Sequence, residues 1–148
     1  MKTLEKKAVR IRRMVSDDVM PILEIWWADI PEKEKVAAEL QGPLDLSFIA
    51  EYEGVLVGFI LAKQVFTGMP MTGVGDIYLI AVNPEYRQHG IGTLMIEALE
   101  KHCRVKSIRT IRAHVPEKDA GIIDYFKSVG FRRSDIVNYD KIEPAVTD

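Results

Sequence analysis

The stretch VNPEYRQHGIGTLMIEALEKH, residues 82–102, changes character in its middle. An apolar run ends at Val82, a turn signal follows at Asn83-Pro84, and Gly90 and Gly92 stand before a helical pattern. The stretch therefore predicts a strand that passes into a helix through a glycine-containing turn. The apolar residues of that helix fall on one face, at Ile91, Leu94, Met95, Ala98 and Leu99.

This turn is suited to binding an anion. A helix N-terminus has unpaired backbone N–H groups and carries about half a positive charge, and glycines let a bulky anion approach the backbone. Phosphate or pyrophosphate is one interpretation, and a plain tight turn is the other. Two familiar loops fit poorly, because Gly92-Thr93 lacks the lysine of a nucleotide phosphate loop and Met95 replaces the third glycine of the dinucleotide fingerprint.

The composition bounds the class of protein. A chain of 148 residues is expected to form one domain, residues 1–148, and a net charge of −2 argues against a nucleic-acid-binding protein. The single cysteine, Cys103, excludes an internal disulfide and fits a reducing compartment. The longest apolar stretch, 55–62, is too short to span a bilayer, and residues 1–7 lead into no signal-peptide core. We expect a cytoplasmic enzyme or binding domain without a membrane partner.

Periodicity predicts a mixed α/β chain with no internal repeat or linker. Alternating apolar residues bounded by turn signals indicate the strands, and helical spacing between capping residues indicates the helices. The expected strands are 9–14, 45–51, 55–65, 75–82, 108–115 and 131–142, and the expected helices lie at about 19–30, 31–42, 91–101 and 117–129.

Two motifs in this pattern resemble those of a known family. Residues 87–92, RQHGIG, resemble the acyl-coenzyme A-binding signature of the GCN5-related N-acetyltransferases, Arg/Gln-x-x-Gly-x-Gly/Ala. Residues 125–131, YFKSVGF, are similar to the second signature of that family, an aromatic pair followed after three residues by Gly-Phe. The order of elements from Val9 to Ile142 also matches, so the resemblance covers nearly the whole chain.

The resemblance implies a fold and a reaction. The fold would be a single α/β (α+β) domain of this family, with a mixed, mostly antiparallel sheet of six or seven strands and about four flanking helices. The sheet would splay between its fourth and fifth strands. The reaction would be direct transfer of an acetyl group from acetyl-CoA to a primary amine of a small molecule or protein, without a metal. A homodimer is compatible with the family.

The resemblance also implies where the coenzyme is held. The backbone N–H groups of the turn would bind the pyrophosphate, Arg87 would close the start of the loop, and the pantetheine arm would pair with the backbone of the fourth strand. Asp119 stands where many members carry an asparagine that contacts the coenzyme. The expected coenzyme contacts are Ile80, Ala81, Val82, Arg87, Gln88, His89, Gly90, Ile91, Gly92, Thr93, Asp119 and Phe126.

Amine acylation requires a general base, and two residues stand at positions where branches of the family carry one. Asp76 lies six residues before Val82, and His114 ends the predicted fifth strand. In model peptides imidazole has the pKa better suited to the task, about 6.5 against about 3.9 for aspartate. Structural roles remain open for both residues. Further candidates are Glu24, Glu51 and Glu117.

The departing thiolate calls for a proton donor, and here the sequence departs from the family. The usual tyrosine lies four residues before the glycine, and that position is Phe126. Tyr125 stands one residue earlier, which on a helix is a rotation of about 100°. Tyr125 is therefore a candidate donor, with water as the alternative. The missing tyrosine also supports a rival interpretation, a non-catalytic acyl-CoA-binding or sensing domain.

Overall fold

The computed structural model describes residues 8–28, 31–40 and 45–146. The chain divides into two compact units, Met1–His114 and Val115–Asp148. Among the described residues, no helix has the length and apolar character needed to cross a membrane.

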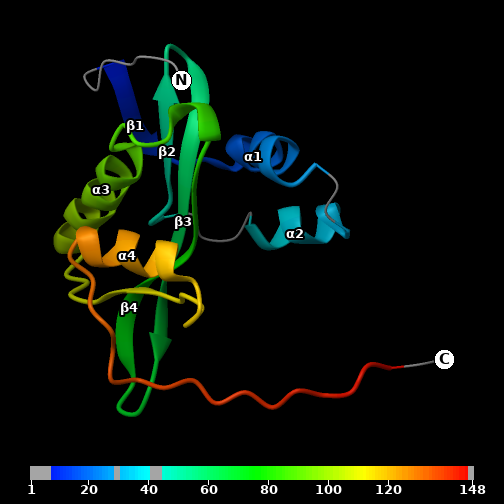
Figure 1. The fold of residues 1–148 in the computed structure, drawn as a ribbon, viewed down its shortest axis with the longest axis vertical. Helices are drawn as coiled ribbons and strands as arrows, with labels where there is room; N and C mark the ends of the chain where they lie inside the picture. Colours follow the sequence, from blue (N-terminus) through cyan, green and yellow to red (C-terminus); the bar gives the residue numbers. More distant parts are fainter. Residues whose placement is uncertain (1–7, 29–30, 41–44, 147–148) are drawn as a thin grey trace. The chain divides into compact units, whose positions relative to one another are not determined.

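The first unit is built on a sheet with the strand order β1-β2-β3-β4-β5 (Figure 1). The first three neighbouring pairs are antiparallel, and β4 pairs with β5 in parallel. The predicted mixed, mostly antiparallel sheet is therefore confirmed. The strands are β1 Val9–Arg13, β2 Phe48–Tyr52, β3 Val55–Thr67, β4 Thr72–Val82 and β5 Ile111–Ala113.

Helices cover both faces of this sheet. The helix α3 lies on one face, and α1 and α2 lie on the other (Figure 1). One short 3-10 helix precedes α1, and another follows β4. These elements are η2 Ser16–Asp18, α1 Val19–Trp26, α2 Lys33–Leu40, η3 Pro84–Tyr86 and α3 Ile91–Val105.

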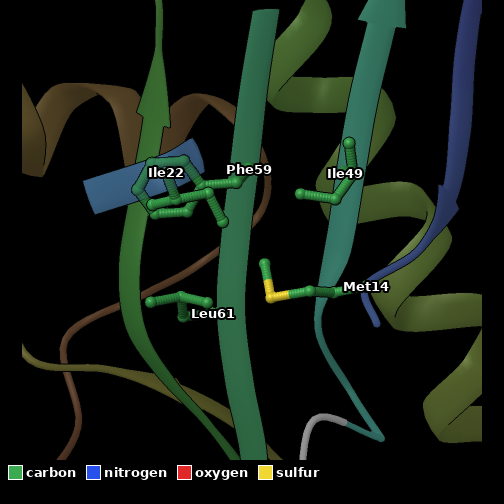
Figure 2. Close-up of a cluster of buried hydrophobic side chains, with 5 residues drawn as sticks. All are labelled: Met14, Ile22, Ile49, Phe59 and Leu61. Carbon is green, nitrogen blue, oxygen red and sulfur yellow. The ribbon is translucent and has the colours of Figure 1, made fainter. Parts of the chain in front are cut away.

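The core forms where the apolar stripes of the helices meet the sheet. A buried cluster joins α1 to β2 and β3, and it consists of Met14, Ile22, Ile49, Phe59 and Leu61 (Figure 2). On α3 the fully buried residues include Met95, Ile96 and Leu99. A Cβ atom at Gly75 would lie 3.2 Å from the Cys103 sulfur, so β4 has a glycine where α3 approaches it closely. The core thus fixes β4 between two helical layers.

A bulge interrupts β4 midway. Leu61 of β3 pairs with Leu79, and the next residue, Ala62, pairs with Ile77, so Tyr78 has no partner on β3. An unpaired extra residue bends a strand and increases its twist. Tyr78 and Leu79 are about two-fifths exposed, directly after the buried residues 74–77 of the same strand.

The second unit holds the helix α4, Ala120–Ser128. Its N-cap is Asp119, whose carboxylate accepts a hydrogen bond from the Ile122 N–H at 3.1 Å. The helix ends before Gly130, which has φ +98°. The helix is shorter than the predicted span of 117–129.

The predicted last strand, 131–142, is absent, so the described sheet has five strands rather than six or seven. A strand needs a hydrogen-bonded neighbour as well as a pattern. In this stretch only the N–H groups of Phe131 and Ile136 donate hydrogen bonds to described residues, and both bonds are local. The predicted strand 108–115 is likewise shorter in the structure, where it covers only Ile111–Ala113. Predicted helical residues 29–30 and 41–42 lie outside the described residues.

Candidate functional site

The two halves of β4 differ in their neighbours. Residues Gly75–Ile77 pair with both β3 and β5. β5 pairs with no other residue of β4. The following half, Leu79–Val82, pairs with β3 alone. The predicted splay between the fourth and fifth strands is therefore present. It leaves one backbone edge of Ile80, Ala81 and Val82, the three predicted strand contacts, without a strand neighbour in the described sheet.

The chain after β4 is shaped by local hydrogen bonds. The Asn83 side chain accepts from the Glu85 N–H at 3.1 Å, and the Tyr86 N–H donates to the Asn83 carbonyl at 2.8 Å. The Arg87 Nε atom donates to the Val82 carbonyl at 3.0 Å. Arg87 therefore ties the start of the loop to the end of β4.

The loop presents free backbone donors. Gln88 and Gly90 adopt the left-handed conformation, with φ +65° and +77°. The first helical hydrogen bond of α3 runs from the Leu94 N–H to the Gly90 carbonyl at 3.0 Å. None of the N–H groups from Gln88 to Thr93 donates a hydrogen bond to a described residue. Six consecutive donors at the positive end of a 15-residue helix form a site for an anion.

The two base candidates lie together. Asp76 in β4 and His114, the residue after β5, meet with 2.8 Å between Oδ1 and Nε2. The Asp76 side chain is 10% exposed and the His114 side chain 53% exposed. Neighbouring residues of a strand point to opposite faces, and Gly75 faces α3, so Asp76 projects from the other face. The sequence analysis left these two residues as alternative general bases. In the structure they form one hydrogen-bonded pair.

Two further residues beside this pair were missed by sequence reasoning. Lys63 lies opposite Asp76 in the β3–β4 ladder. Its ammonium group lies 5.0 Å from the ring centroid of Tyr78, the residue exposed by the bulge. A bulge depends on the pairing of two strands, so no signal in the sequence alone marked Tyr78.

The remaining predicted residues belong to the second unit. The Asp119 carboxylate caps α4. Phe126 is buried, with its ring centroid 5.3 Å from that of Tyr125 and 5.1 Å from that of Phe131. The Tyr125 hydroxyl is buried and has no hydrogen-bond partner among the described residues. Burial raises the pKa of Tyr125 to about 12.

The other acidic candidates have different surroundings. Glu51 is bound by Arg12, which also binds Asp18 through two hydrogen bonds of 2.8 Å. Glu117 lies 3.7 Å from Arg133 on an exposed surface, and Glu24 is exposed on α1. In the part of the chain that the structure describes, no three His, Cys, Asp or Glu side chains gather as metal ligands would.

Comparison with known proteins identifies the family. Residues 12–131 match the profile of the acetyltransferase (GNAT) family. The chain therefore belongs to the GNAT acetyltransferase family, as the two motifs predicted.

Individual relatives are distant. An uncharacterised N-acetyltransferase of Methanocaldococcus jannaschii is 25% identical, over 88% of this chain and 64% of that protein. The [ribosomal protein bS18]-alanine N-acetyltransferase of Escherichia coli K12 is 26% identical, over 72% of this chain and 68% of that enzyme. The chain thus spans slightly less than two thirds of the first of these relatives.

Solved structures share the fold. The aminoglycoside N-acetyltransferase AAC(6′)-Iy, in complex with a bisubstrate analogue of coenzyme A, superimposes with a TM-score of 0.76. The match covers 92% of this chain and 99% of that chain at 20% sequence identity. At this identity the likeness establishes the fold.

Proposed function

We propose that this protein transfers an acetyl group from acetyl-CoA directly to a primary amine. The observation that carries the proposal is the end of β4 that pairs with β3 alone, followed by a loop with six backbone N–H groups that donate to no described residue. A strand edge suits the amides of a pantetheine arm, and helix-terminal N–H groups suit a pyrophosphate. Membership of the GNAT family and the coenzyme A in a structural relative support this assignment.

The coenzyme would lie along β4 and across the loop. Backbone groups of Ile80, Ala81 and Val82 would bind the pantetheine arm, and the N–H groups of Gln88–Thr93 would bind the pyrophosphate. Arg87 would hold the loop closed through its hydrogen bond to the Val82 carbonyl. Asp119 and Phe126 remain proposed contacts from the second unit.

The chemistry requires a neutral amine. At pH 7 an ordinary lysine side chain is neutral only a few parts in ten thousand, a cost of roughly 4–5 kcal/mol. We assign the base to His114, because its exposed imidazole can take a proton while Asp76 holds the ring and balances the resulting charge. The amine nitrogen attacks the thioester carbonyl, the C–S bond breaks, and the thiolate leaves with the electron pair. The thiolate then takes a proton from water or from Tyr125.

The acceptor is proposed only as a primary amine of a small molecule or protein. One relative is named as an aminoglycoside N-acetyltransferase, and another is named as acting on an alanine of a ribosomal protein. A panel of an aminoglycoside, an alanine-initiated peptide and a lysine peptide, assayed by release of free thiol from acetyl-CoA, distinguishes these classes. If no amine is acetylated although acetyl-CoA binds, the non-catalytic binding domain suggested by Phe126 replaces the enzyme.

Coenzyme binding at the loop is tested by Gly90→Val. A branched side chain at φ +77° strains the turn and blocks approach to the backbone. Calorimetry should show acetyl-CoA affinity reduced at least tenfold, about 1.4 kcal/mol.

A matched glycine controls for strain. Gly54 has φ +78° in the β2–β3 turn, with no atom within 4 Å of an added Cβ. Gly54→Val should destabilise the fold to a similar extent and leave acetyl-CoA affinity unchanged. Equal affinity of wild type and folded Gly90→Val would contradict the pyrophosphate site.

A further inference from the structure

A lysine stands beside the Asp76–His114 pair without bonding to it. Lys63 of β3 lies directly opposite Asp76 of β4 in the antiparallel ladder. Side chains of opposite residues project from the same face of a sheet, with Cβ atoms about 5 Å apart. An ammonium and a carboxylate at these two positions could form an ion pair. The Asp76 carboxylate instead binds His114 at 2.8 Å, and Lys63 forms no ion pair with it.

The Lys63 side chain is held over an aromatic ring. Its Nζ atom lies 5.0 Å from the ring centroid of Tyr78, the residue that the bulge in β4 leaves without a partner on β3. This distance is within the reach of a cation–π contact, about 6 Å. The ring positions the ammonium but contributes no net negative charge. Among the described residues of the first unit, no Asp or Glu forms an ion pair with Lys63, so its charge stays uncompensated within that unit.

The position of this charge matters for an amine acceptor. An ordinary alkylamine reaches the Asp76–His114 pair as an ammonium, because its pKa lies well above 7. The nearby Lys63 ammonium repels an acceptor that carries only positive charge. An anionic group on the acceptor reverses the effect, because it binds the lysine while the amine lies at the histidine. The same lysine therefore hinders one class of acceptor and favours another.

We propose that Lys63 selects acceptors that carry a carboxylate several carbon atoms from the reacting amine. The carboxylate binds the Lys63 ammonium beside Tyr78, and the amine lies at the Asp76–His114 pair. Tyr78 is two residues beyond Asp76 along β4, about 7 Å, which sets the separation of the two groups. All four residues belong to the first unit. The inference rests on the proposed function and narrows its acceptor to an amine with an acidic group, as opposed to a polycation.

Matched acceptors test this selection by charge. ω-Amino acids with two to five methylene groups are compared with their neutral amides, and release of free thiol is measured at a fixed concentration of acetyl-CoA. The measured quantity is kcat/KM for the acid divided by kcat/KM for its amide. For at least one acid, this ratio should fall at least tenfold in Lys63→Gln, the effect of losing one hydrogen bond between charged groups. Comparing variants on the same two acceptors cancels the difference in amine pKa between acid and amide.

Three further variants separate the local charge from the net charge. Lys63→Arg keeps the charge and should retain most of the acid-to-amide ratio. Lys101→Gln removes an exposed lysine from α3, on the opposite face of the sheet (Figure 1), and should leave the ratio unchanged. Tyr78→Leu should lower the ratio, because the ammonium loses the ring that positions it. An equal fall in Lys101→Gln and Lys63→Gln would overturn the proposal.

A binding measurement separates this proposal from the reaction. In an NMR titration with the protein saturated with coenzyme A, wild type should bind at least one of the acids tenfold more tightly than Lys63→Gln does. Such binding without any acetyl transfer would overturn the proposed function and leave the carboxylate site standing. Acetylation with the same acid-to-amide ratio in wild type and Lys63→Gln, or of other amines but none of these acids, would overturn the role of Lys63 alone. Neither turnover nor binding that depends on Lys63 would overturn both.

Discussion

Two aspartates of the first unit are almost equally buried, but their partners differ. The Asp18 side chain is 11% exposed and is bound by Arg12, whereas the Asp76 side chain is 10% exposed and is bound by His114. A guanidinium keeps its proton in folded proteins. Imidazole, by contrast, has one ring nitrogen that donates and one that accepts when it is neutral, and His114 is 53% exposed. Arg12 can therefore only donate hydrogen bonds to its carboxylate, whereas an imidazole nitrogen can also accept one.

The comparison shows that a buried carboxylate does not by itself mark a catalytic site. Asp18 accepts two hydrogen bonds from Arg12 and a third from the Val15 N–H at 2.8 Å, all at the junction of β1 and α1. Asp76 leaves its partner open to solvent at the point where β4 loses its second neighbour. The two pairs therefore differ in the chemistry of the partner and in its exposure to solvent, and these differences are the basis for proposing a catalytic role for only one of them.

The largest effect is expected from His114→Ala. If His114 is the base, turnover at saturating amine should fall by about 10²–10⁴. Added imidazole should restore part of the activity. His114→Gln can still hydrogen-bond to Asp76, and it should be equally slow without being rescued. Full activity of His114→Gln would assign the residue a structural role.

Asp76→Asn tests whether the carboxylate supports the histidine or is itself the base. A supporting carboxylate next to an exposed imidazole should contribute about tenfold, because solvent screens the pair. Turnover should fall by that factor with the acetyl-CoA affinity unchanged. Loss of all activity in Asp76→Asn, together with full activity in His114→Ala, would move the base to Asp76.

Asp18→Asn should affect stability and leave turnover unchanged. Hydrogen bonds to charged groups contribute about 1.5–3 kcal/mol each, so urea unfolding at pH 7 should show a loss of about that size. Asp17→Asn, at the exposed neighbouring position, is the control and should change little. A comparable loss in Asp17→Asn would point to the helix dipole rather than to Arg12.

The stability difference should depend on pH in a defined direction. The hydrogen bond with Arg12 holds the pKa of Asp18 below its usual value. A carboxylate with a lowered folded-state pKa stabilises the fold above its unfolded pKa, about 3.9, and that stabilisation is lost as pH falls through the folded value. The difference between wild type and Asp18→Asn should therefore be complete at pH 7 and shrink in strong acid.

The sequence predicted the site unevenly, and the reason is physical. The glycine loop and the apolar face of α3 are local patterns, so the strand–turn–helix unit could be located before the fold was known. The Asp76–His114 contact depends on the parallel register of β4 and β5, which joins residues 38 positions apart. The missing strand after Phe131 shows the same limit, because alternation predicts a strand only where a neighbour supplies hydrogen bonds.

Tyr125→Phe is expected to give the smallest effect, because the Tyr125 hydroxyl is buried and donates to no described residue. A proton donor should have a pKa near that of the thiol it protonates, about 8.5. Burial raises the pKa of Tyr125 to about 12, and its hydroxyl has no hydrogen-bond partner among the described residues. Transfer from Tyr125 to the thiolate would therefore be uphill, whereas a thiolate is a tolerable leaving group without help. Turnover should fall less than tenfold, with acetyl-CoA affinity nearly unchanged.

Tyr139→Phe, at a tyrosine that is 94% exposed in the same unit, is the matched control and should have no effect on turnover. A drop of 10² or more that is confined to Tyr125→Phe would establish Tyr125 as the donor.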